Sequence, residues 1–155
     1  MPKDNQGKDS VKMTLPAKMA YLPIVTEAVR QYAATVGFPE EDIHKIVLSV
    51  EETVVNIIHH SFVDQEASPS FDISLDIIRN PYGLSIRIND KGIPFDPSRQ
   101  PVYYLKKDWA DQDISGLGLK LIQGMMDRVE YRNLGRKGKE ALLIKYCVRP
   151  DQDGN

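Results

Sequence analysis

The chain has very little cysteine and no long apolar run. Its 155 residues include one cysteine, Cys147, which excludes an internal disulfide and agrees with a reducing cytoplasm. Cys147 stands in the apolar stretch ALLIKYCV, so we expect a buried strand thiol rather than a nucleophile. A membrane-spanning helix needs about 20 consecutive apolar residues. No stretch approaches that length, so we expect a cytoplasmic protein without a membrane partner.

A strong net charge is absent as well. Lysine and arginine together number 20, and aspartate and glutamate number 22, which gives a formal net charge of −2. Without an excess of positive charge, no overall field attracts the chain to nucleic acid or to anionic lipid. We therefore expect no direct nucleic-acid partner.

The two ends of the chain are polar. The first stretch, MPKDNQGKDS, lacks the apolar segment of a signal peptide. We expect residues 1–10 to be a disordered leader and residues 150–155 to be a flexible tail. Residues 11–149 then form a single domain, which is the usual expectation for a chain of this length.

Apolar residues recur at helical spacing in two stretches. In residues 22–38, Pro23 suits the first turn of a helix and Gly37 suits its end. Residues 39–62 begin with Pro39 and acidic side chains, which are favourable at the positive end of a helix dipole. The positions expected to face the core are Leu22, Val25, Val29, Tyr32, Val36, Ile43, Ile46, Val47, Val50, Val54, Ile57 and Ile58.

Alternating stretches predict the strands. Residues 11–17, 71–79 and 84–90 alternate, and the last two flank the turn NPYG. Residues 91–114 have no periodicity and suit a lid or binding loop. Residues 116–129 suit a helix, and residues 129–133 and 139–148 a closing hairpin. The predicted fold is α+β, a two-layer sandwich in which helices cover one face of a mainly antiparallel mixed sheet.

One of these helices has a row of polar residues inside EETVVNIIHH. Glu52, Asn56 and His60 are four positions apart, so each advances only about 40° around the helix and the three share one face. Their neighbours are valine, isoleucine and threonine, which indicates that this face is partly covered. The alternative is a polar stripe at the helix edge, hydrogen-bonded to neighbouring backbone.

A second candidate feature, NDKGIPFDP, ends the strand of residues 84–90. Asp90 departs from the apolar alternation, and Gly92 permits a positive φ or the close approach of a ligand. A carboxylate only accepts hydrogen bonds, so Asp90 suits an exocyclic amino group such as that of adenine. The alternative is an ordinary Asp-Gly turn.

The third feature is SGLGL, residues 115–119, at the start of the predicted helix of residues 116–129. The free N–H groups of a helix N-terminus attract anions, and glycines let phosphate oxygens come close. Ser115 is also a plausible N-cap. Helix capping alone is therefore the alternative explanation.

In this order and spacing, the three features resemble the ATP-binding domain shared by gyrase, histidine kinases and mismatch-repair ATPases, the GHKL superfamily. The resemblance is closer to the bacterial anti-sigma-factor serine kinases. Their first box, E-x-x-x-N-x-x-x-H, is matched by Glu52, Asn56 and His60. Their later boxes resemble residues 90–97 and 116–119, the latter running on into LIQGMMDRVEYR. The likeness covers about residues 12–148 and implies the Bergerat ATP-binding fold.

The resemblance implies a role for each residue of the boxes. Glu52 would be the catalytic base, Asn56 the Mg²⁺ ligand, and His60 a supporting residue of the site. A cation for the γ-phosphate is also expected, and Lys106, Lys107 and Lys120 are candidates beside the alternative of solvated lysines. The residues expected to bind ATP are Asn56, His60, Asp90, Gly92, Pro94, Phe95, Ser115, Gly116, Leu117, Gly118 and Leu119.

The function implied by this resemblance is that of an ATP-binding anti-sigma factor. Such a protein is a serine/threonine kinase that uses ATP and Mg²⁺ to phosphorylate an anti-sigma-factor antagonist. It also binds a sigma factor, regulates transcription and forms a homodimer. The alternative is a nucleotide-responsive binding module of the same fold with little or no kinase activity. Glu52 favours the kinase, because a protein that only binds nucleotide has no use for a base.

Overall fold

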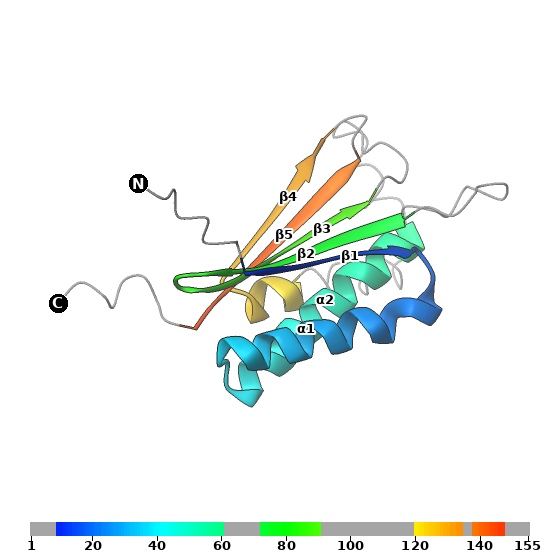
Figure 1. The fold of residues 1–155 in the computed structure, drawn as a ribbon. Helices are drawn as coiled ribbons and strands as arrows, with labels where there is room; N and C mark the ends of the chain where they lie inside the picture. Colours follow the sequence, from blue (N-terminus) through cyan, green and yellow to red (C-terminus); the bar gives the residue numbers. More distant parts are fainter. Residues whose placement is uncertain (1–8, 61–71, 91–119, 135–137, 148–155) are drawn as a thin grey trace, which may run out of the picture.

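The computed structural model describes residues 9–60, 72–90, 120–134 and 138–147. Two helices follow the first strand, and four further strands follow them (Figure 1). The elements are β1 (Ser10–Pro16), the short 3-10 helix η1 (Met19–Tyr21), α1 (Leu22–Val36), α2 (Glu40–His60), β2 (Asp72–Asn80), β3 (Gly83–Asp90), β4 (Arg128–Asn133) and β5 (Lys139–Tyr146). A further short helix spans residues 120–125. This order confirms the predicted α+β fold.

The strands form one sheet in the order β1-β2-β3-β5-β4. Every pairing between these described strands is antiparallel. The turn from β2 to β3 is the predicted one, because the Asn80 side-chain oxygen accepts hydrogen bonds from the backbone N–H groups of Tyr82 and Gly83. Gly83 is required there, since a Cβ atom at this position would lie 2.2 Å from the Lys145 backbone oxygen.

The helices lie on one face of the sheet (Figure 1). Along β3 every second side chain is fully buried against them, as Leu84, Ile86 and Ile88 show. The apolar stripe of α2 packs into the same core through Ile46 and Val50. Burying one such aliphatic side chain contributes about 1.5–3 kcal/mol, so this packing fixes α2 beneath the sheet.

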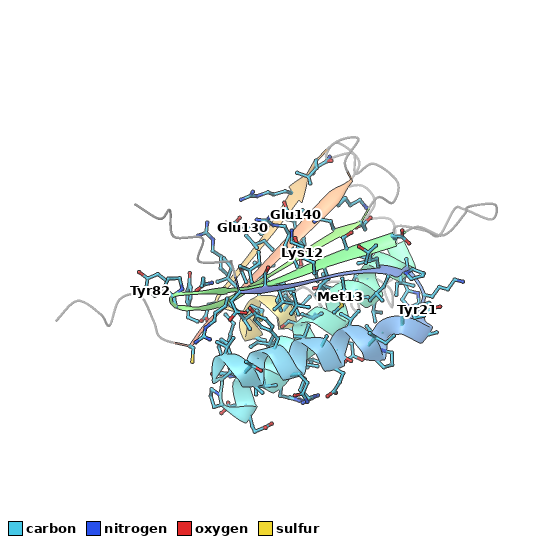
Figure 2. The ribbon with its side chains drawn as sticks, viewed as in Figure 1. Lys12, Met13, Tyr21, Tyr82, Glu130 and Glu140 are labelled. Carbon is cyan, nitrogen blue, oxygen red and sulfur yellow. The ribbon has the colours of Figure 1, made fainter. Side chains whose placement is uncertain are left out.

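The opposite face of the sheet carries charged side chains. Glu130 of β4 and Glu140 of β5 lie on it, together with Lys12 of β1 (Figure 2). Glu140 pairs with Arg87 of β3, and Glu130 pairs with Arg128. The sheet therefore separates a charged face from the apolar face that the helices cover.

Both ends of α1 follow the predicted signals. Pro23 lies in the first turn, and Gly37 ends the helix with a left-handed φ of 103°. The Gly37 N–H donates to the carbonyl oxygens of Ala33 and Ala34, which the end of the helix would otherwise leave unpaired. At the start of α2, three acidic residues follow Pro39, as the helix dipole favours.

Two predictions about the end of the chain were wrong. The helix expected over residues 116–129 ends at residue 125 in the described part, because the Asp127 N–H donates to the Ile144 oxygen of β5 and β4 begins at Arg128. Cys147 is exposed rather than buried in a strand. It lies one residue beyond β5, whose pairing with β3 ends where Tyr146 meets Gly83. Among the described residues, no helix has the length and apolar character that a bilayer crossing requires.

Candidate functional site

The polar row of α2 lies beside two buried hydroxyl groups. Ser49 and Thr53 are buried, and each hydroxyl donates to the backbone oxygen one turn earlier, at 2.8 Å and 2.7 Å. Glu52 and Asn56 are half-buried next to them. Within the described part of the chain, the side chains of Glu52 and Asn56 make no such bond to backbone. The helix therefore satisfies these two hydroxyls locally, whereas within the described residues the Glu52 carboxylate and the Asn56 amide have no such local bond.

His60 is the last residue of α2. Its backbone continues the helix from Asn56, so it keeps the spacing of the row. Its side chain lies outside what the structure describes, and its supporting role stays a prediction.

Asp90 is the last residue of β3 and is only 3% exposed. It continues the alternation of Ile86 and Ile88, so its side chain points to the face that the helices cover. Its strand neighbours are Ile73 of β2 and Lys139 of β5. A carboxylate only accepts hydrogen bonds, so Asp90 at this position is compatible with the predicted contact to an exocyclic amino group of a ligand.

Asp90 and the polar row of α2 occupy the same end of the molecule. Figure 1 shows the C-terminal half of α2 beneath the end of the sheet at which β3 finishes. Both features also belong to the same side of the sheet. The half of α2 that carries Glu52 and Asn56 therefore lies toward the end of the sheet at which β3 finishes with Asp90.

The remaining predicted site residues lie outside the described residues, as do Lys106 and Lys107. These site residues are Gly92, Pro94, Phe95, Ser115, Gly116, Leu117, Gly118 and Leu119. The described helix that follows them, residues 120–125, packs beneath the sheet through Ile122, and Met126 just after it is buried as well. Lys120, the first described residue of this helix, is exposed, and its role stays open.

A magnesium ion fits the side chains that are present. In the ranges that the structure describes, no three histidine, cysteine or acidic side chains gather as a metal cluster. Mg²⁺ prefers oxygen ligands and keeps most of its positions for phosphates and water. The half-buried Asn56 amide oxygen has the chemistry of such a ligand, and its contact with Mg²⁺ stays a prediction.

A comparison with known families decides the class of this domain. The model of the histidine kinase-like ATPase domain matches residues 15–145. The chain belongs to the histidine kinase-like ATPase domain family. Use of a nucleotide is thus the property that the chain shares with this family, and Glu52, Asn56 and Asp90 fall inside the matched range.

Curated members of this family are similar along almost the whole chain. The serine-protein kinases RsbW of Bacillus cereus (strain AH820) and of Bacillus anthracis are each 28% identical over 153 residues, covering 95% of this chain and 92% of the relative. A crystal structure of the RsbU and RsbW domains of a Mycobacterium tuberculosis protein matches with a TM-score of 0.55 and 16% identity. It covers 91% of this chain, which spans 33% of that protein, and supports the fold.

Proposed function

We propose that this chain is an ATP-dependent protein serine kinase that phosphorylates an anti-sigma-factor antagonist and also binds a sigma factor. One observation carries the proposal: β3 ends at the buried Asp90, and the C-terminal half of α2, which carries Glu52 and Asn56, lies beneath that end of the sheet. The similarity to serine-protein kinases over 95% of the chain supports it.

Each described residue has a separate task in this proposal. Asp90 accepts a hydrogen bond from the exocyclic amino group of adenine. Asn56 offers its amide oxygen to Mg²⁺, which neutralises phosphate charge when it is bound. Glu52 lies one helical turn before Asn56, and its carboxylate takes the proton from the serine hydroxyl of the protein substrate.

Partners and assembly are part of the same proposal. The antagonist protein supplies the serine hydroxyl, and the sigma factor is bound without being phosphorylated. A homodimer formed through the sheet edge and α1 is expected, and the protein is expected to act in the cytoplasm. Light scattering at high protein concentration tests the dimer, and a monomer mass under those conditions rejects it.

Incubation with labelled ATP tests the proposed reaction. The purified chain is mixed with antagonist proteins encoded near its gene, and the labelled residue is mapped. The kinase predicts label on a serine of one antagonist, dependent on Mg²⁺. A protein that binds ATP and sigma factor but transfers no label would instead be the nucleotide-responsive binding module. A protein that binds no ATP would contradict both functions.

A further inference from the structure

A lysine is buried in the core on the side of the sheet that carries the proposed ATP site. Lys145 of β5 alternates with Ala141 and Leu143, so it points toward the helices. Its side chain is only 11% exposed. An ammonium group is seldom buried to this degree unless it is paired. The proposed kinase reaction does not use Lys145, which therefore needs another explanation.

The ammonium group of Lys145 contacts three other parts of the chain: the helix of residues 120–125, α2 and the segment before β4. Its Nζ donates a 2.7 Å hydrogen bond to the backbone oxygen of Met125, the last residue of the helix of residues 120–125. It also lies 4.0 Å from a carboxylate oxygen of Asp42 in the first turn of α2, and 4.0 Å from one of Asp127 before β4. We call this group the Lys145 cluster: Lys145, Asp42, Asp127 and the Met125 carbonyl.

The charges of the cluster suit its position. The C-terminal end of a helix attracts a cation, and Lys145 occupies such an end at Met125. Asp127 is itself fixed, because its carboxylate accepts a 2.7 Å hydrogen bond from the Tyr146 N–H. One cation thus holds the end of one helix against the first turn of another.

One of the two helices joined by the cluster carries part of the proposed site. Glu52 and Asn56 belong to α2, whose first turn holds Asp42. Asp42 and Asn56 are 14 positions apart on α2, or about 21 Å along its axis. Lys145 is therefore too distant to touch the nucleotide, but it lies where it can set the position of both helices.

We propose that Lys145 is a positioning residue, which holds the first turn of α2 against the end of the helix of residues 120–125 and so fixes the placement of the Glu52–Asn56 row. The consequence for ATP rests on the proposed kinase function. A displacement of 1 Å far from the reacting atoms can lower a rate by about 10²-fold. We therefore expect the loss of this ammonium group to impair phosphate binding and transfer at the Glu52–Asn56 row.

Hydrogen exchange tests the cluster without any nucleotide. Lys145→Met keeps the length of the side chain and removes its charge. The Met126 N–H, which donates to the Ile122 oxygen, is the reporter of the helix end. We expect its exchange to become at least about tenfold faster in Lys145→Met, because a hydrogen bond and two ion pairs are lost. Lys45→Met is the matched control, since Lys45 pairs with Glu41 on the exposed side of the same helix. Unchanged exchange in Lys145→Met would overturn the proposal.

Nucleotide binding tests the consequence for the site. In folded Lys145→Met, affinity for ATP is expected to fall at least about tenfold while affinity for adenosine stays within about twofold, since Asp90 is unaffected. Lys145→Arg, which keeps a cation and a donor, is expected to restore much of the ATP affinity. Equal losses for ATP and adenosine, or no rescue by arginine, would mean that Lys145 only stabilises the fold, and would overturn the proposal. A wild-type protein that binds no ATP would contradict the kinase function itself, while the exchange result would still decide whether Lys145 holds the helix.

Discussion

Asp90 stands directly opposite Ile73 in the antiparallel pair of β2 and β3, and both side chains are buried on the face that the helices cover. A carboxylate thus replaces the aliphatic side chain that the alternation of β3 would otherwise place in the core. A carboxylate at the end of a buried strand can accept a hydrogen bond from a ligand, and we assign Asp90 to the exocyclic amino group of adenine.

Asp90→Asn is expected to weaken ATP binding by about tenfold to a hundredfold, because a hydrogen bond to a charged group contributes about 1.5–3 kcal/mol. Asparagine presents one acceptor oxygen and adds a competing donor. Calorimetric titration measures the affinity. Asp76→Asn, the same change on the opposite face of β2, is the control and should bind ATP as the wild type does. Unchanged affinity in a folded Asp90→Asn protein would rule out the adenine contact.

Asn56→Ala is expected to remove most of the Mg²⁺ dependence of ATP binding, because the amide oxygen is the protein ligand assigned to the metal. Some affinity for metal-free ATP should remain through Asp90. Titrations with Mg²⁺ and with a chelator measure the two affinities. If the variant responds to Mg²⁺ as the wild type does, Asn56 has a structural role and the metal is held elsewhere.

Tyr32 gives the fold a dependence on alkaline pH. Its hydroxyl donates a 2.5 Å hydrogen bond to the Asp9 backbone oxygen, and burial, followed by the Asp9 charge, raises the pKa of Tyr32 above 10.0. The pKa of Tyr32 is higher in the folded chain than in the unfolded chain. The Tyr32 hydroxyl therefore stabilises the fold fully below pH 10, and this stabilisation is lost as the pH rises through the folded pKa.

Tyr32→Phe is therefore expected to lower the free energy of unfolding by about 0.5–1.5 kcal/mol near neutral pH, the contribution of one hydrogen bond. Above pH 10 the difference between the variant and the wild type should shrink. Urea unfolding at about pH 8 and about pH 11 measures both values. A difference that stays constant between these conditions would show that the hydroxyl does not titrate as described.

Much of the fold was readable in the sequence, because burial on one face imposes a period on each element. The strict alternation of β3 and the helical stripe of α2 are direct results of that burial. The same reasoning predicted Glu52, Asn56 and Asp90 as departures from the apolar pattern. In the structure β3 ends at Asp90, and the C-terminal half of α2 lies beneath that end of the sheet.

Other features depend on contacts between distant parts of the chain. The helix of residues 120–125 ends earlier than predicted because the Asp127 N–H donates a hydrogen bond to the Ile144 oxygen of β5. The sequence around Asp127 does not predict this bond, because Ile144 is distant in the chain. The sequence does not predict the ion pair of Lys145, because its partner Asp42 is far away in the chain. Its burial could have been suspected from the alternation with Leu143, which places both on the same face.

The most direct test of the central claim compares Glu52→Gln with Glu51→Gln, its neighbour on α2, for transfer of phosphate to the antagonist. Glutamine keeps the size of the side chain but cannot accept a proton near neutral pH. The account predicts that both variants bind ATP within a few-fold of wild type, and that only Glu52→Gln loses transfer, by roughly 10² to 10⁴, the usual contribution of a general base. Equal transfer by the two variants, or loss of ATP binding and folding in Glu52→Gln, would contradict the assignment of Glu52 as the catalytic base.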